Sequence, residues 1–317
     1  WGNSLFEDPA EFTYGMFLGI FHQRRKLADL VREALAADTP GEVKDALQGW
    51  LDNMKDPIGS RKYGDQLKAL LPAQNGNPLL AKIAEKSKLF TKKSFWIFAG
   101  DGAAYDIGYG GVDHVLATNE DINLLIMDTE VYSNTGGQMS KSTPLGAVAK
   151  FAAGGKTIGK KDVAQQAIAY GNVYVARVAF GANPQQTLQA LREAEAYPGP
   201  SLIIAYSHCI AHGFNLEQGL QQQKRAVDSG HWPLIRYNPL IREAGGNPFT
   251  LDSLRPTMPL MEYRKIEGRF KQLARDNPQE AERLSRIAEQ AARLRWDVYE
   301  KMSLRHAEEF PADGRRD

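Results

Sequence analysis

The stretch Gly100-Asp101-Gly102-Ala103-Ala104-Tyr105 follows an apolar segment at residues 95–98 and precedes a second apolar segment at residues 122–127. Both apolar segments have the length and composition of buried β-strands, and residues 103–117 between them have the length of a crossover helix. A second oxygen-rich turn follows the second strand and reads Asp128-Thr129-Glu130-Val131-Tyr132-Ser133-Asn134-Thr135-Gly136-Gly137-Gln138. The sequence therefore predicts a βαβ unit whose two polar loops emerge at the carboxyl edge of a parallel sheet, where such folds bind ligands.

Asp101 is the unusual residue of the first loop. The glycines on either side of it allow a sharp turn and a close approach to an anion, and the helix start beyond them offers unpaired N–H groups to a phosphate. A bare carboxylate would repel that phosphate, and a divalent cation between the two removes the conflict. Mg²⁺ prefers hard oxygen ligands, which Thr129, nearby main-chain carbonyls and Asn134 can supply. The two loops together predict a site for Mg²⁺ and a diphosphate.

The order of these motifs resembles a known family. Gly100-Asp101-Gly102, followed by an oxygen-bearing turn at Thr129 and then by Asn134, is similar to the thiamine diphosphate and magnesium motif. The second loop and Ser142-Thr143-Pro144-Leu145-Gly146-Ala147-Val148-Ala149-Lys150-Phe151 resemble the thiamine-binding domain near the C-terminus of the pyruvate:ferredoxin (flavodoxin) oxidoreductases, from residue 1 to roughly residue 303. The resemblance implies the α/β thiamine diphosphate-binding fold, a doubly wound, mostly parallel sheet with flanking helices. The alternation of strands and helices from residue 95 to residue 206 predicts the same architecture.

The resemblance also implies roles for individual residues. Asp101 would give a carboxylate oxygen to Mg²⁺, Thr129 a second oxygen and Val131 its main-chain carbonyl. Asn134 would face the reactive end of the cofactor and is the candidate catalytic residue. The residues expected to contact the cofactor are Gly100, Asp101, Gly102, Ala103, Thr129, Glu130, Val131, Tyr132, Ser133 and Asn134.

Cys209 is the single cysteine of the chain and stands in Ser207-His208-Cys209-Ile210-Ala211-His212-Gly213, directly after the strand expected at residues 202–206. A lone cysteine excludes an internal disulfide, is typical of a reduced cytoplasmic protein, and is more often a buried small residue or loop thiol than a metal ligand. The resemblance implies instead that Cys209 is the fourth ligand of a four-iron, four-sulfur cluster whose other three cysteines precede Trp1. The alternative is a zinc site with His208 and His212, for which His22, His114, His231 and His306 offer no motif spacing as a fourth ligand.

The resemblance implies an activity of the EC 1.2.7.1 type. This is the oxidative decarboxylation of a 2-oxoacid, most simply pyruvate, to acetyl-coenzyme A, with electrons leaving singly through the iron–sulfur cluster to ferredoxin or flavodoxin. We expect only half of an active site, inactive alone, because the glutamate that activates the aminopyrimidine is missing; Glu7 and Glu11 lack the expected sheet context. The partners would be the remainder of the same enzyme, which as a full-length chain would form a homodimer.

Two alternatives remain open at this point. The first is a thiamine-binding subunit that serves another 2-oxoacid. The second is a non-catalytic, nucleotide-binding α/β domain in which Gly100-Asp101-Gly102 is only a turn. Dinucleotide binding is poorly supported, because no Gly-x-Gly-x-x-Gly fingerprint follows the first strand.

Composition narrows the class of protein further. The chain has 317 residues, 43% of them hydrophobic, with 39 basic against 38 acidic side chains, so no nucleic-acid or membrane partner is predicted. The apolar runs are strand-sized and Trp1 opens no signal peptide, so we expect a cytoplasmic protein. Because no initiator Met is present, we expect a fragment or a processed product. Lys156, Lys160 and Lys161 are predicted to be solvated surface, or alternatively a patch for an acidic electron carrier or a coenzyme A phosphate.

We expect four parts along the chain. Residues 1–90 should be a helical lead-in, residues 91–240 the thiamine diphosphate and magnesium-binding α/β core, residues 241–304 a C-terminal helical extension, and residues 305–317 a disordered tail. Hydrophobic periodicity and turn residues predict helices at 11–35, 40–54, 63–71, 79–90, 162–170, 183–197, 215–229, 260–275 and 278–302. Further strands are predicted at 173–178, 202–206 and 232–237.

Overall fold

The computed structural model describes residues 10–74 and 76–305, and these form two compact units. One unit consists of residues 14–95, and the other combines residues 96–305 with the first residues of the opening helix. The sequence predicted a lead-in to the sheet rather than a separate unit for residues 1–90, whereas residues 14–95 pack around a core of their own. The disordered tail predicted for residues 305–317 lies outside the described residues, except for Arg305.

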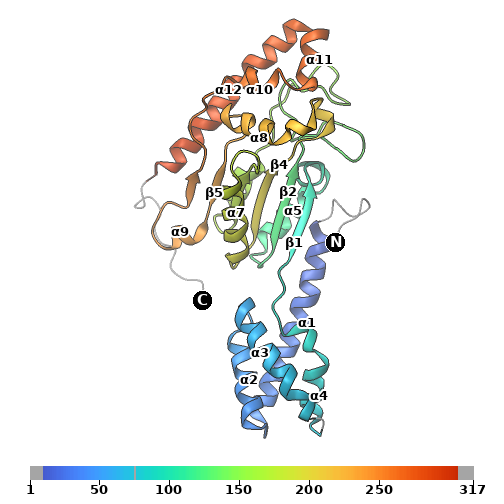
Figure 1. The fold of residues 1–317 in the computed structure, drawn as a ribbon, viewed down its shortest axis with the longest axis vertical. Coiled ribbons are helices and arrows are strands. Elements are labelled where there is room, and N and C mark those ends of the chain that lie inside the picture. Colours follow the sequence, from blue (N-terminus) through green and yellow to red (C-terminus); the bar gives the residue numbers. More distant parts are fainter. Residues whose placement is uncertain (1–9, 75, 306–317) are drawn as a thin grey trace. The chain divides into compact units, whose positions relative to one another are not determined.

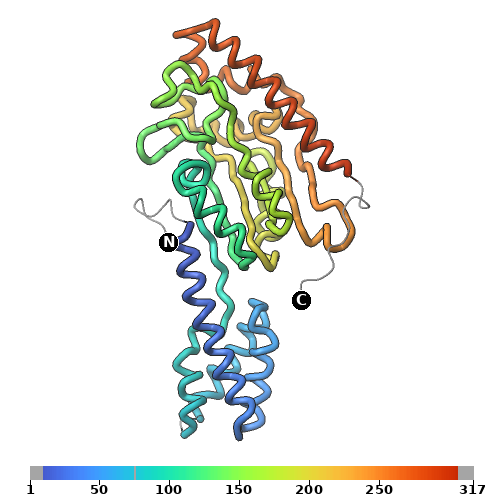
Figure 2. The backbone as a smooth tube through the Cα atoms, turned by 180° about the vertical axis from the view of Figure 1, so that it is seen from behind, coloured from blue at the N-terminus to red at the C-terminus, as the bar shows by residue number. Residues whose placement is uncertain are grey.

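The helical unit contains most of α1 (Ala10–Ala36) together with α2 (Gly41–Asp52), α3 (Pro57–Leu70) and α4 (Pro78–Glu85), and Figure 2 shows these helices in blue to teal. The 3-10 turns η1 (Leu71–Gln74) and η2 (Ser87–Leu89) follow α3 and α4. Helix α3 begins earlier than predicted, because Asp56 accepts a hydrogen bond from the Gly59 N–H and Pro57 occupies the first turn. The largest buried side chains of the unit are Leu27, Leu47, Trp50, Leu67, Leu80, Ile83 and Phe90.

The second unit is built on a six-stranded sheet with the strand order β1-β2-β4-β3-β5-β6 (Figure 1). Strands β1 (Trp96–Gly100), β2 (Asn123–Asp128), β3 (Tyr174–Val178) and β4 (Ser201–Tyr206) are parallel. Strands β5 (Ile235–Tyr237) and β6 (Phe249–Leu251) run antiparallel at one edge. The predicted α/β fold with a mostly parallel sheet is therefore confirmed. Strand β6 was missed because three residues beside Gly245-Gly246-Asn247-Pro248 offer no alternating pattern.

The crossover between β1 and β2 differs from the single helix that we predicted. It is a π-helical turn, η3 (Gly102–Ile107), followed by α5 (Tyr109–Ala117), and π-turns of this kind are frequent at functional sites. The side chain of Asp162 caps the start of helix α6 (Val163–Ile168), and the side chain of Asn183 caps the start of α7 (Pro184–Ala196). Between β4 and β5 lie the 3-10 turns η4 (Ile210–His212) and η5 (Leu216–Gln218) and helix α8 (Gly219–Asp228).

Four helices close the described chain: α9 (Pro239–Glu243), α10 (Leu260–Arg264), α11 (Gly268–Asp276) and α12 (Pro278–Ser303). The helix predicted over residues 260–275 is interrupted between α10 and α11, where the buried side chain of Glu267 turns inward to pair with Arg269. Helix α12, red-orange in Figure 1, packs beside α11 and β6. No helix among residues 10–74 and 76–305 is long and apolar enough to cross a membrane.

The sheet is buried most completely at β3, of which every residue is buried. One of its faces packs with α7 in a cluster formed by Tyr174, Ala176, Val178, Ala190, Ala194, Tyr197 and Ile203. Strands β1, β2 and β4 are neighbours in the sheet, so the loops that follow them start side by side at its carboxyl edge.

Candidate functional site

Three loops meet at the carboxyl ends of β1, β2 and β4. Asp101 follows β1 directly, Thr129 follows β2 directly, and Cys209 lies three residues beyond β4. The Ser133 hydroxyl lies 3.3 Å from the Cys209 Sγ, and the His212 Nε2 lies 2.7 Å from the Thr129 carbonyl oxygen. The structure therefore brings together the candidate residues that the sequence placed on three separate loops.

The three predicted magnesium ligands gather around the Thr129 hydroxyl. Its Oγ1 lies 2.8 Å from Asp101 Oδ1 and 2.9 Å from the Val131 carbonyl oxygen. In an octahedral Mg²⁺ site with bonds of about 2.0–2.1 Å, neighbouring ligand oxygens are about 2.9 Å apart. The hydroxyl is therefore as far from the carboxylate oxygen and from the carbonyl oxygen as neighbouring ligands of such a site are from each other, and a set of three hard oxygens fits Mg²⁺.

The same residues do not form a site for a softer metal. No three His, Cys, Asp or Glu side chains gather as a metal site anywhere in the described part of the chain. His212 contacts the Thr129 carbonyl, and His208 Nδ1 lies 3.3 Å from Gln223 Nε2. The structure thus argues against the zinc alternative built on Cys209, His208 and His212.

Asp101 is buried, with 1% of its surface exposed. Its second carboxylate oxygen accepts a hydrogen bond of 2.6 Å from the Ser140 hydroxyl, in addition to those from Thr129 to the first oxygen. Burial and then the neighbouring Asp128 carboxylate raise the pKa of Asp101 to about 7. The charge of Lys160 offsets part of this rise, and a divalent cation at Asp101 would stabilise its ionised form further.

Asp128 ends β2 and is fully buried. Its carboxylate accepts hydrogen bonds from the Tyr105 hydroxyl at 2.7 Å and the Ser142 hydroxyl, and it pairs with Lys160 Nζ at 2.7 Å. These contacts tie β2 to the segment that follows the second loop, so Asp128 supports the shape of the loop. The sequence did not reveal this role. Both Asp101 and Asp128 stand at the end of a strand, and what distinguishes them is the set of side chains that folding brings to each.

Glu130 is the strained residue of the second loop, with a φ of +58° and no exposed surface. Its carboxylate pairs with Arg269 Nη2 at 2.7 Å, His231 Nε2 at 3.0 Å and Lys160 Nζ at 3.1 Å. Burial raises its pKa, but the charges of Lys160, His231 and Arg269 outweigh burial and hold the pKa of Glu130 well below its usual value. Its main-chain N–H also donates to Asp128 Oδ1, and its carbonyl oxygen accepts from the Thr143 hydroxyl, so Glu130 holds the shape of the loop from inside.

The lysines after the second loop correct one of our predictions. Lys156 is buried, and its Nζ donates to the carbonyl oxygens of Ser140, Lys141 and Thr143. Lys160 has 11% of its side chain exposed and pairs with both buried carboxylates. The prediction of a solvated surface is therefore wrong for Lys156 and Lys160, because both ammonium groups hold the polar interior of the loop together.

The remaining cofactor candidates lie around the first turn. A Cβ at Gly102 would lie 2.2 Å from the ring of Tyr132, so a larger residue there would displace that ring. The Tyr132 hydroxyl donates to the Gly102 carbonyl at 3.3 Å. Gly100 ends β1 and Ala103 is buried beneath the turn. Ser133 and Asn134 are exposed on the second loop, where they are accessible to a ligand.

Several contributors were not found from the sequence. Ser140 lies 39 positions from its partner Asp101, and Arg269 lies 139 positions from Glu130, so no local motif joins them. His212 was considered only as a metal ligand, whereas it contacts the Thr129 main chain. Burial, followed by the charge of Arg269, lowers the pKa of His212 to about 4, so it is neutral and holds the loop by a hydrogen bond. Glu11, one of the two acidic candidates, lies in the first turn of α1, and Glu7 lies outside the described residues.

Comparison with protein families gives two matches. Residues 23–79, within the helical unit, match the family described as the pyruvate-ferredoxin oxidoreductase insertion domain. Residues 72–205, which include the loops after β1 and β2, match the C-terminal TPP-binding domain of thiamine pyrophosphate enzymes. The resemblance stated from the sequence is thereby confirmed, with the addition that the helical unit carries a family match of its own.

Curated relatives extend the similarity over nearly the whole chain. The chain is 49% identical over 309 residues to the pyruvate:ferredoxin oxidoreductase of Moorella thermoacetica. The aligned region covers 96% of this chain and 26% of that protein. The chain is also 49% identical to a pyruvate-flavodoxin oxidoreductase of Trichormus variabilis and 44% identical, over 88% of the chain, to a pyruvate dehydrogenase [NADP(+)] of Cryptosporidium parvum. The chain thus spans about a quarter of the length of the first two relatives.

Among solved structures, a 2-oxoglutarate:ferredoxin oxidoreductase from Magnetococcus marinus matches 47% of the chain and 46% of its own, at 21% identity and a TM-score of 0.36.

Proposed function

We propose that the chain is the thiamine diphosphate-binding quarter of a pyruvate:ferredoxin or pyruvate:flavodoxin oxidoreductase. The premise is that it matches both the insertion domain of pyruvate-ferredoxin oxidoreductases and the C-terminal TPP-binding domain of thiamine pyrophosphate enzymes. The whole enzyme would oxidise pyruvate to acetyl-coenzyme A and carbon dioxide. The identity of 49% to relatives named for pyruvate favours pyruvate over another 2-oxoacid.

The observation that carries the proposal is the oxygen triad of Asp101 Oδ1, Thr129 Oγ1 and the Val131 carbonyl. Asp101 and the other two residues lie on different loops, yet the Asp101 and Val131 oxygens both lie within 2.9 Å of the Thr129 hydroxyl at the carboxyl edge of the sheet. The three oxygens would hold Mg²⁺, which in turn would hold the diphosphate beside the N–H groups of η3.

The bound cofactor would supply an electron sink for decarboxylation, and the residues of this chain would hold the cofactor in place. Gly102 admits the Tyr132 ring and so fixes the separation of the two loops. Asn134, exposed on the second loop, would donate or accept a hydrogen bond at the reactive end. His212 holds the carbonyl of Thr129 and thereby restrains the second loop from the side of β4.

Cys209 would supply one thiolate to a four-iron, four-sulfur cluster, and the sequence contains no second cysteine. The remaining ligands would have to come from the rest of the enzyme. The Ser133 hydroxyl and the Ala211 N–H lie 3.3 and 3.5 Å from the sulfur, and hydrogen bonds of this kind tune cluster potentials. The electrons would pass to ferredoxin or flavodoxin, the two acceptors named for the relatives.

The test is calorimetric titration of the chain with thiamine diphosphate, in Mg²⁺ and in EDTA. We expect binding that requires Mg²⁺. The variant Thr129→Val keeps the shape of the side chain but removes the oxygen shared by the triad, so we expect affinity to fall by about tenfold or more. The matched control is Thr135→Val, which changes an exposed threonine on the same loop outside the triad.

Two results would overturn the proposal. One is binding in EDTA that equals binding in Mg²⁺. The other is an equal effect of both valine variants, because the Thr129 hydroxyl would then have no special part. Circular dichroism of each variant shows whether a loss of binding reflects a loss of fold.

A further inference from the structure

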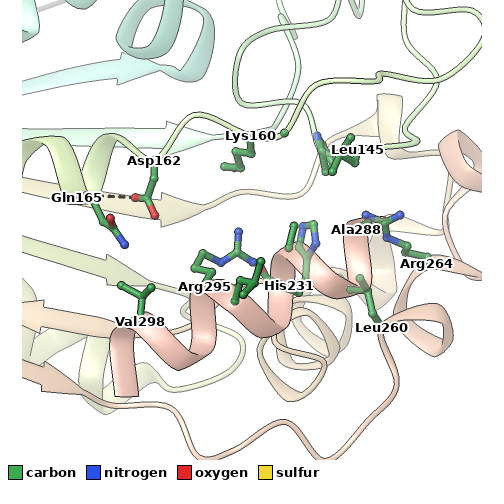
Figure 3. Close-up of a pocket in the computed structure, with 15 residues that line it drawn as sticks. Leu145, Lys160, Asp162, Gln165, His231, Leu260, Arg264, Ala288, Arg295 and Val298 are labelled. Atoms are coloured by element: carbon green, nitrogen blue, oxygen red, sulfur yellow. Dashed lines mark hydrogen bonds between the residues drawn. The ribbon is translucent and has the colours of Figure 1, made fainter. Parts of the chain in front are cut away.

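A cavity lies under α12, apart from the oxygen triad. It has a volume of about 300 Å³ and is bounded by α12, α10 and the segment of residues 144–165. Its wall is largely apolar and includes Leu145, Leu260 and Ala288. Figure 3 shows Lys160 and Leu145 on one side of it and Arg295, His231 and Arg264 in a row on the other.

Arg264 is unusual among the residues that line this cavity, because it is a buried charged side chain without an ion-pair partner among the described residues. Its side chain is buried, with 3% of the residue exposed, and its Nε has no hydrogen-bond partner among the described residues. Its guanidinium stacks on the Phe270 ring at 4.5 Å, and no carboxylate of the described chain forms an ion pair with it. Burial lowers the pKa of Arg264 to about 10, which leaves it positively charged at neutral pH.

The other charged groups at the cavity are already engaged. Lys160 pairs with Asp128 and Glu130, and His231 contacts Glu130. The carboxylate of Asp162 accepts hydrogen bonds from Tyr299 and from the Gln165 N–H, and Figure 3 places it at the opposite end of the cavity from Arg264. The charges of Glu130 and Glu267 also act on Arg264, but both carboxylates pair directly with Arg269, so within the described residues no carboxylate is in direct contact with Arg264.

Arg295 adds a second guanidinium. Its Nη2 donates to the main-chain oxygens of Gly230 and His231 at 3.1 and 2.8 Å, and its Nε has no partner in the described chain. Burial and the nearby Arg177 lower the pKa of Arg295. The cavity therefore holds an excess of positive charge with unused N–H donors.

We propose that this cavity binds a small organic anion whose carboxylate pairs with Arg264. An uncompensated buried charge is strongly unfavourable, and a planar guanidinium matches a carboxylate with two parallel hydrogen bonds. The volume is at the lower end of the range of small-molecule sites, and the apolar wall suits the body of a short-chain acid. This site is independent of the thiamine diphosphate site proposed above.

The test measures the thermal unfolding of the chain with butanoate, succinate or sulfate, at constant ionic strength set with sodium chloride and without Mg²⁺ or thiamine diphosphate. We expect the two carboxylates to raise the unfolding temperature in a saturable way, with calorimetry giving the affinity, and sulfate to have less effect. Stabilisation by sulfate alone would overturn the assignment to a carboxylate.

Three variants locate the effect. In Arg264→Met the affinity for the carboxylates should fall by about tenfold or more, the loss of a charged hydrogen bond, while the unfolding temperature without anion should rise. Ala291→Leu places bulk on an exposed position of the cavity lining and should lose the anion response while Arg264 stays. Arg286→Met, on an α12 side chain that is 70% exposed, should change neither.

The proposal fails if the carboxylates stabilise wild type and Arg264→Met equally, or if they stabilise none of the proteins. It also fails if Ala291→Leu, which keeps the guanidinium, binds the anion as tightly as wild type does. If Arg264→Met does not fold, the comparison of Ala291→Leu with Arg286→Met decides the question, because both leave Arg264 in place.

Discussion

The helical unit and the sheet unit differ in what their interiors contain. The buried polar or charged residues described in the helical unit are Arg24, Thr39 and Ser60, and Arg24 donates only to the main-chain carbonyls of Met54, Leu89 and Phe90. The sheet unit instead buries Asp101, Asp128, Glu130, Lys156, Arg177, Arg264, Glu267 and Arg269. Apolar contacts account for the first interior, whereas the second keeps charges that cost stability unless each is paired.

This difference between the two interiors indicates which unit carries the functional site. Buried charges gather behind the loops that follow β2 and β4, where they fix the main chain around the oxygen triad. Perturbed ionisable groups at one place are a sign of a functional site rather than of folding alone. Among the described residues of the helical unit, Arg24 is the one buried side chain that carries a charge, and it donates to main-chain carbonyls rather than joining a cluster of ionisable groups. We therefore infer that this unit contributes structure to the proposed enzyme rather than chemistry.

The largest expected effect comes from breaking the charge network of the sheet unit. Arg269 pairs with Glu130 at 2.7 Å and with Glu267 at 2.6 Å, and all three side chains are buried. Arg269→Met leaves both carboxylates without this partner and should lower the free energy of unfolding by about 3–5 kcal/mol. Urea denaturation followed by circular dichroism measures the loss.

The control for that prediction is Arg275→Met. Arg275 pairs with Asp276 on the surface at 2.8 Å, and the arginine side chain is 76% exposed, so its removal should have little effect. A loss in Arg269→Met as small as the loss in the control would mean that the buried charges do not stabilise the sheet unit, and the contrast between the two interiors would disappear.

A smaller effect is expected from the apolar interior of the helical unit. Leu47 is fully buried in its core, and Leu47→Ala should lower the free energy of unfolding by about 3 kcal/mol through lost burial and the remaining cavity. Because we assign no ligand contact to this unit, the affinity for thiamine diphosphate with Mg²⁺ should not change. Denaturation and titration of the same preparation test both statements, and a loss of affinity in a folded variant would contradict the structural role.

How much of this could be predicted depended on the sequence separation of the residues involved. Strands β1 to β5, and the positions of Asp101, Thr129 and Cys209 on the loops after β1, β2 and β4, were predicted because hydrophobic runs and the turns that follow them are local signals. The network around Glu130 was missed because His231 and Arg269, the latter in α11, are 101 and 139 residues away from it in the sequence. Strand β6 and the break between α10 and α11 also depend on tertiary partners, which composition does not reveal.

The smallest expected effect concerns the contact between two of the loops, and Cys209 can report it as the single cysteine of the chain. The Ser133 hydroxyl lies 2.9 Å from Thr129 Oγ1 and 3.3 Å from Cys209 Sγ. Mg²⁺ bound at Thr129 would draw on the same hydroxyl network and restrain the second loop over the thiol. We expect Mg²⁺ with thiamine diphosphate to slow alkylation of Cys209 by roughly two- to fivefold, because thiol reactivity follows environment and access.

Intact-mass spectrometry of the chain treated with iodoacetamide gives this rate directly. In Ser133→Ala the rate should respond less to the ligand, while Thr135→Val, on the same loop, should behave like wild type. An unchanged rate under conditions where calorimetry shows saturation would mean that the triad and the thiol are adjacent but independent. A slowed rate that depends on Ser133 would instead mean that the serine couples the metal loop to the cysteine loop. The buried charges would then serve to hold two loops in register, which the apolar interior of the helical unit is not required to do.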